Sequence, residues 1–299
     1  MAVACTPVQA TWRTRVTRIG SVVGAVLVVA CVAFVGRRLA HEWGAARHAL
    51  GQATWSWIVL AVVAAGAAMT AIALGWQRVL DALGARVATS DAVAWYFVGE
   101  IGKYLPGTVW PVVGRAELAR RGGVARAVSY QSVVLSLLLL YLACALVGGA
   151  LVGIGAAIVV VVGIAVLHPA VSGRLLDVAR RVTRRDLDVV VPSLATSARL
   201  TAVYVPAWVL VGTATWAVAR ALDPSASWVH IVPAATASWL VGFLAVPVPG
   251  GVGVREAAFV AFATGLAPGV APATAVIARL VFVAVDAAGA GVLAPRARR

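Results

Sequence analysis

Two short stretches of the chain combine helix-breaking residues with charged side chains. Residues 102–110 read Gly-Lys-Tyr-Leu-Pro-Gly-Thr-Val-Trp, and residues 247–256 read Pro-Val-Pro-Gly-Gly-Val-Gly-Val-Arg-Glu. Proline removes a backbone donor, and glycine admits backbone conformations closed to other residues. Inside a bilayer the freed backbone groups must be satisfied by protein or by water in a cavity. Broken helices with charges at membrane depth therefore indicate a substrate pathway.

The candidate substrate-binding residues belong to these two stretches and to the last apolar segment. They are Glu100, Lys103, Pro106, Gly107, Trp110, Arg115 and Glu117, then Pro249, Gly250, Gly251, Gly253, Arg255 and Glu256, and finally Arg279 and Asp286. A helix that starts near Arg255 would favour an anion such as a phosphate, which Arg255 can pair with directly. The alternative is that Arg255 and Glu256 simply lie in the membrane interface.

The other charged candidates also allow two interpretations each. Glu100 and Lys103 are three residues apart and can pair on one helix face, either as an interfacial ion pair or as a gate or head-group contact. Arg115 with Glu117 leaves the same choice. Arg279 and Asp286 are seven apart, and so on one helix face, where they serve either structural pairing or a lipid or ion pathway.

The composition identifies a membrane protein. Hydrophobic residues make up 62% of the chain and charged residues 12%. Six long runs contain no charge: 19–36, 55–75, 127–167, 200–219, 231–254 and 257–278. About 20 apolar residues cross a bilayer as a helix. The net charge of +14 lies between these runs, which indicates membrane topology and contact with anionic lipid rather than nucleic acid.

No set of residues predicts catalysis. The serines and histidines have no triad spacing, no nucleotide-binding motif is visible, and the three cysteines and four histidines have neither disulfide nor metal-ligand spacing. We expect a protein that is not an enzyme and that uses no metal or other cofactor. Its expected partners are membrane lipids with anionic or polar head groups, and a lipid-synthesis enzyme is a further candidate.

The expected fold is all-α and polytopic, with about six full transmembrane helices and two broken or re-entrant hairpins. The full spans are expected near 19–40, 55–78, 127–148, 155–167, 200–221 and 273–293. The run 127–167 would be about 60 Å long as one helix, so it must turn, and glycines 148, 149, 153 and 155 mark the turn region. The first hairpin covers 89–125 and bends at 105–107. The second covers 231–265.

Positive charge favours the cytoplasmic side of a membrane. The arginines near both ends of the chain therefore place both termini in the cytoplasm, together with the basic loop 168–199. The second hairpin must then enter from the outer side and the first from the inner side. Such an inverted pair is typical of transporters whose substrate site lies near the midplane.

At its two motifs the sequence resembles the flippase-like membrane domain of the lysylphosphatidylglycerol synthases, or multiple peptide resistance factor proteins, in a stand-alone form. Residues 102–107 with Trp110, Gly114 and Arg115 resemble the first motif, and residues 249–256 resemble the second. The resemblance covers approximately 18–294. It implies movement of aminoacylated, glycosylated or other polar-headed lipid between leaflets. We expect no soluble aminoacyl-transferase domain in these 299 residues.

The resulting domain prediction has three parts. Residues 1–17 form a basic cytoplasmic segment, 18–294 the flippase-like transmembrane domain, and 295–299 a basic tail. The first apolar run continues past Cys31 to Arg37, which favours a retained helix over a cleaved signal. The leading functional prediction is a lipid transporter of the cell membrane. The alternative is a non-catalytic membrane subunit or scaffold that supports lipid or glycolipid synthesis.

Overall fold

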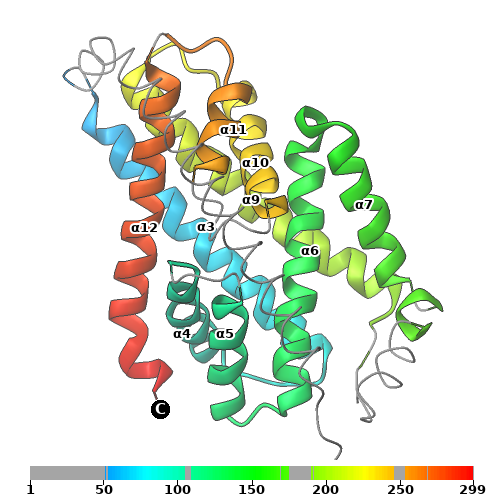
Figure 1. The fold of residues 1–299 in the computed structure, drawn as a ribbon. Coiled ribbons are helices and arrows are strands. Elements are labelled where there is room, and N and C mark those ends of the chain that lie inside the picture. The colour runs from blue at the N-terminus through cyan, green and yellow to red at the C-terminus, as the bar shows by residue number, and fades with distance from the viewer. Residues whose placement is uncertain are drawn as a thin grey trace, which may run out of the picture.

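The computed structural model describes residues 51, 53–104, 109–168, 170–174, 190, 192–245, 253–267 and 269–298. These residues are mainly helical and contain no strand, which confirms the all-α prediction. The elements are α3 (Trp55–Ala82), α4 (Thr89–Glu100), the 3-10 helix η1 (Ile101–Tyr104), α5 (Trp110–Arg121), α6 (Arg126–Val152), α7 (Ile154–Leu167), α9 (Leu194–Leu222), α10 (Trp228–Leu244), α11 (Val254–Phe262) and α12 (Val270–Ala297) (Figure 1).

Four of the described helices, α3, α6, α9 and α12, are long and apolar enough to cross a membrane. Each extends beyond its predicted limits, and α9 contains Pro206 in its interior. The predicted span at 155–167 corresponds to α7, which has 14 residues. A helix of that size is about 21 Å long, shorter than the hydrocarbon core of a bilayer. The span predicted at 19–40 lies outside the described residues.

The turn between α6 and α7 is shorter than the sequence predicts. Gly153 alone makes it, with φ of 60°, a conformation that favours glycine. Gly148 and Gly149 lie inside α6 instead. A Cβ at Gly148 would come within 2.5 Å of the Ala237 backbone nitrogen, so this glycine lets α6 approach α10 closely. Small residues serve this role in membrane helix packing.

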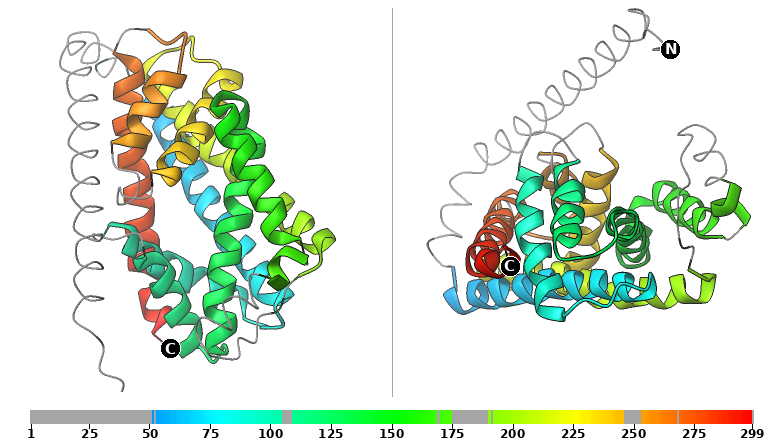
Figure 2. Two further views of the ribbon diagram at one scale, coloured as in Figure 1. Left: turned by 45° about the vertical axis from the view of Figure 1, so that its right-hand side comes forward. Right: turned by 90° about the horizontal axis from the view of Figure 1, so that it is seen from below.

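Helices α3 and α9 run antiparallel. The start of α3 lies beside the end of α9, where the Thr54 N–H donates to the Ala221 carbonyl. Seen from below, they form one layer against which the remaining long helices pack (Figure 2). Two buried indole N–H groups of this layer are satisfied: Trp76 Nε1 donates to Ser132 Oγ, and Trp208 Nε1 donates to the Leu140 carbonyl. Such bonds remove the cost of burying polar atoms.

The two broken hairpins enter the bundle from opposite ends (Figure 1). The first consists of α4 and α5, and its base is tied to the end of α12 by an ion pair between Asp91 and Arg296 at 2.8 Å. The second consists of α10 and α11. Its base meets the start of α12, where Asp223 Oδ2 accepts from the Ala267 N–H at 3.0 Å. The two hairpins are therefore opposed within the bundle, as the sequence predicts.

Candidate functional site

Helix α12 carries the counter-charges of both hairpins on one face. Asp286 lies 2.7 Å from Lys103 Nζ of the first hairpin, and Arg279 Nη1 lies 2.6 Å from Glu256 Oε1 of the second. The two α12 residues are seven positions apart, about 10 Å along the helix axis. The charged flanks of the two breaks therefore meet near the middle of one helix, far closer than the roughly 30 Å between opposite interfaces.

The first cluster consists of Glu100, Lys103, Arg115 and Asp286. Glu100 at the end of α4 contacts both cations of the first cluster, Lys103 at 3.3 Å and Arg115 at 3.6 Å. Asp286 is fully buried and Arg115 is 1% exposed. The four formal charges cancel, which reduces the high cost of burying them.

Aromatic rings and a glycine hold Arg115 in the first cluster. Its guanidinium lies over Tyr96, 5.3 Å from the ring centroid, and over Trp76 at 5.9 Å. Such cation–π contacts favour a buried guanidinium. A Cβ at Gly99 would come within 2.5 Å of Arg115 Cγ, so glycine at this position permits the approach.

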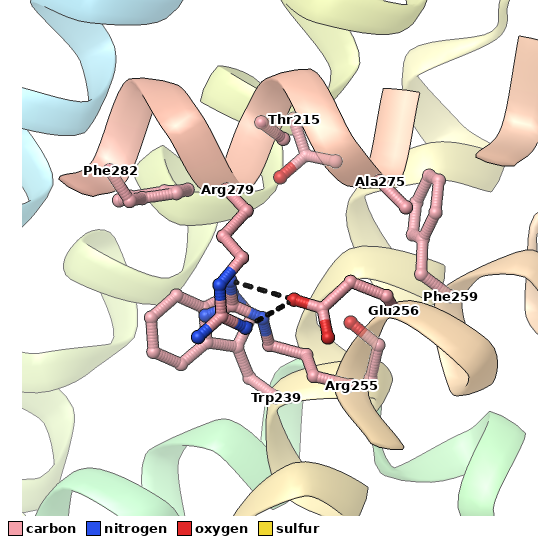
Figure 3. Close-up of a pocket in the computed structure, with 10 residues that line it drawn as sticks. Thr215, Trp239, Arg255, Glu256, Phe259, Ala275, Arg279 and Phe282 are labelled. Carbon is pink, nitrogen blue, oxygen red and sulfur yellow. Dashed lines mark hydrogen bonds and ion pairs between the residues drawn. The ribbon is translucent and has the colours of Figure 1, made fainter. Parts of the chain in front are cut away.

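The second cluster consists of Arg255, Glu256 and Arg279 (Figure 3). Gly253, with φ of 81°, starts α11, and its N–H donates to Glu256 Oε2 at 2.6 Å. The other oxygen of Glu256 faces both cations, Arg279 at 2.6 Å and Arg255 at 3.4 Å. The local backbone thus fixes the carboxylate as a bridge, and the cluster has a formal charge of +1.

Trp239 of α10 packs against the second cluster. The Arg255 guanidinium lies 4.1 Å from the centroid of its ring. The ring edge in turn contacts Phe282 of α12, with centroids 5.5 Å apart. This packing joins the two arms of the second hairpin to α12 (Figure 3).

The second cluster borders a small pocket. Its lining consists of Thr215, Ser238, Trp239, Arg255, Glu256, Phe259, Ala275, Ala278, Arg279 and Phe282. The cavity volume is about 20 Å³, enough for a water molecule but not for a phosphate with its substituents. The ion pairs thus close the site in this conformation.

Comparison with known families agrees with this architecture. The family described as the lysylphosphatidylglycerol synthase TM region matches residues 21–290. The chain belongs to this family. A search of the curated proteins found no match. The match covers both hairpins, the helices α3, α6 and α9, and α12 up to residue 290, so the lysylphosphatidylglycerol synthase TM region accounts for nearly the whole chain.

The structure brings seven candidate residues of this lysylphosphatidylglycerol synthase TM region into the two clusters. They are Glu100, Lys103, Arg115 and Asp286 in the first and Arg255, Glu256 and Arg279 in the second. Gly253 supports the second through its backbone. Pro106, Gly107, Pro249, Gly250 and Gly251 lie outside the described residues.

Two candidates lie apart from both clusters. Glu117 pairs with Arg120 at 2.7 Å and Arg121 at 3.2 Å on the exposed side of α5. It does not pair with Arg115, because residues two apart point to different sides of a helix. Trp110 begins α5 and is 47% exposed.

The aromatic partners of the clusters were absent from the sequence prediction. Trp239 gave one usable signal, because it lies inside the charge-free run 231–254 rather than at a run's end. Tryptophan in membrane proteins is enriched at the interfaces. A tryptophan away from the ends of an apolar run therefore indicates a specific contact. Nothing comparable marks Tyr96, which adjoins two other aromatic residues.

Proposed function

We propose that this protein binds the polar head group of a membrane lipid between its two hairpins and moves the lipid between leaflets. The observation that carries the proposal is the meeting of two opposed hairpins, each with a buried charged cluster, on one face of α12. Buried charges are costly in membrane proteins and mark substrate pathways. We place the protein in the cell membrane with both termini in the cytoplasm, on the distribution of its arginines.

The second cluster is the better candidate for the head group, because it has two guanidinium groups and one carboxylate. A phosphate that approached Arg255 and Arg279 would compete with Glu256 for the same donors. Guanidinium groups bind phosphate through two parallel hydrogen bonds. The exchange of Glu256 for phosphate would open the closed pocket and leave the carboxylate on its backbone donor at Gly253.

The first cluster would respond in a different way, because its charges balance. It offers no surplus cation, so an anion gains less there. Its Asp286–Lys103 pair instead ties the first hairpin to α12. We assign this pair to the opening and closing of the path rather than to the first contact with the lipid.

The test is transport of fluorescent lipids in reconstituted liposomes, with phosphatidylglycerol, its lysyl ester and a glycolipid compared. Arg255→Gln should slow transport of the preferred lipid roughly 10- to 100-fold, since charge-assisted hydrogen bonds contribute about 1.5–3 kcal/mol. Arg255→Lys should restore part of the rate, because the charge remains but the planar fork is lost. Arg120→Gln, which alters an exposed arginine on α5, is the matched control.

Two outcomes would overturn the proposal. Equal rates for Arg, Lys and Gln at position 255 would return this arginine to an interfacial role. Wild-type liposomes no faster than empty ones for every lipid would favour the alternative, a non-catalytic membrane subunit that supports lipid or glycolipid synthesis.

A further inference from the structure

A second, larger pocket lies away from both charged clusters. It forms where loop 83–88, between α3 and α4, meets loop 122–125, between α5 and α6. Its volume is about 390 Å³, which falls in the range of small-molecule sites. Trp95 and Val128 provide apolar lining, and the loops provide backbone and Arg86.

The pocket lies at the level of lipid head groups. Loop 83–88 follows the end of α3, and loop 122–125 precedes the start of α6, both of which are long enough to span a membrane. The ends of such spans lie at the boundary between hydrocarbon and water. A ligand in this pocket would therefore meet both the lipid surface and the aqueous phase.

The charges around the pocket favour an anion. Arg86 lines it and is exposed, and within the described part of the chain no carboxylate pairs with it. The one lining carboxylate, Asp91, is already paired with Arg296 at 2.8 Å. The lining and the residues that flank its two loops carry four arginines against three carboxylates: Arg86, Arg120, Arg121 and Arg126 against Asp81, Asp91 and Glu117.

The loops are shaped to keep the pocket open. Gly84 and Gly123 have φ of 84° and 93°, so each loop leaves its preceding helix abruptly. A Cβ at Gly122 would overlap the ring of Trp95, which fixes the second loop against α4. The N-cap residues of the following helices α4 and α6 are Ala88 and Ala125, which supply no side-chain cap. The first backbone N–H groups of each helix therefore have no capping side chain.

We propose that this pocket binds a phosphate group, held by Arg86 and supplied by the head group of an anionic lipid. The site is separate from the two hairpin clusters, and it would bind phosphate whether or not the protein moves lipid between leaflets. Free inorganic phosphate has the same chemistry, so the source of the phosphate is decided by experiment.

The experiment is native mass spectrometry of the purified full chain in neutral detergent, titrated with phosphatidylglycerol, phosphatidylcholine or inorganic phosphate. Wild-type protein should retain one phosphatidylglycerol more tightly than phosphatidylcholine. Arg86→Gln should weaken that binding roughly tenfold or more. Ala88→Phe, which fills the pocket and keeps every charge, should weaken it as well. Arg199→Gln, an exposed arginine that does not line the pocket, should bind as the wild type does.

The experiment distinguishes a lipid source of the phosphate, a soluble source and the absence of a site. Loss of phosphatidylglycerol in both pocket variants, without loss in Arg199→Gln, supports the site and its lipid source. Saturable retention of inorganic phosphate that both variants abolish, with no preference for phosphatidylglycerol, supports the site with a soluble source. Equal binding by wild type, both pocket variants and the control overturns the proposal.

Discussion

Removal of the Asp286 carboxylate tests whether the first cluster joins the hairpin to α12. Asp286 is fully buried, and its Oδ2 lies 2.7 Å from Lys103 Nζ. The change Asp286→Asn keeps the shape but shifts the cluster from neutral to +1. Loss of one partner from a buried ion pair costs about 3–5 kcal/mol. Lys103 is 20% exposed and keeps Glu100 as a neighbour, so we expect the lower end, about 3 kcal/mol.

A double-mutant cycle isolates the pair from other effects. Lys103→Met alone leaves Asp286 charged and buried, so it should also destabilise the protein. The double variant removes both charges. Its loss of stability should be smaller, by about 2–3 kcal/mol, than the summed losses of the two single variants. The measurement is unfolding of the purified protein in mixed micelles with increasing sodium dodecyl sulfate. Glu117→Gln, in an exposed pair, is the control and should change stability far less than Asp286→Asn does.

Two results would refute this reasoning. The first is an Asp286→Asn variant as stable as the Glu117→Gln control. The second is strict additivity of the two single changes, which would mean that the 2.7 Å contact contributes no coupling. Either result would also remove the basis for assigning the pair to the opening of the path.

Three further predictions follow from packing, hydrogen bonding and charge. Gly148→Ala should lower stability by about 1–3 kcal/mol, because the added methyl group meets the backbone of α10. Gly66→Ala, where the added methyl group meets open space, should raise stability by about 0.5–1 kcal/mol. Thermal unfolding measures both variants, and equal shifts of the unfolding temperature would contradict the close packing at Gly148. Burial raises the pKa of Asp223, but hydrogen bonds from a hydroxyl and two backbone N–H groups outweigh burial and hold it below its usual range. Its stabilisation should therefore be present above pH of about 4 and be lost as the pH falls through the lowered pKa, and Asp223→Asn should abolish that part of the pH dependence. Reporter fusions at residue 299 and within 168–199 should both report the cytoplasm, and an outside signal from either would reject the orientation.

The sequence was most informative about where the chain breaks. Proline and glycine beside charges predicted the positions of both hairpins. A broken backbone within an apolar segment must be satisfied by protein or by water in a cavity, and a buried hairpin meets that requirement. The spacing of Arg279 and Asp286 also placed them on one face of α12 correctly. The sequence could not identify the ion-pair partners of Arg279 and Asp286. Each lies beside a different hairpin, and that pairing depends on how three helices pack.

Other errors arose where tertiary contacts override local pattern. The glycines at 148 and 149 have the composition of a turn, yet Gly148 serves close packing against α10. Arg115 and Glu117 are near in sequence but face different surroundings, one buried and one in solvent. The 14-residue α7 shares an uninterrupted apolar run with α6, so composition alone could not reveal how short it is.

The order of Lys103 and Asp286 along the chain has a consequence for biosynthesis. Lys103 leaves the ribosome 183 residues before Asp286, a delay of roughly 10–40 s at typical rates of synthesis. During that time the first cluster has only Glu100, Lys103 and Arg115, with a formal net charge of +1 and without the counter-ion Asp286. Burial of that net charge is costly, so the first hairpin should complete its packing only after α12 has been made. Final assembly of the first cluster would then wait for the synthesis of α12.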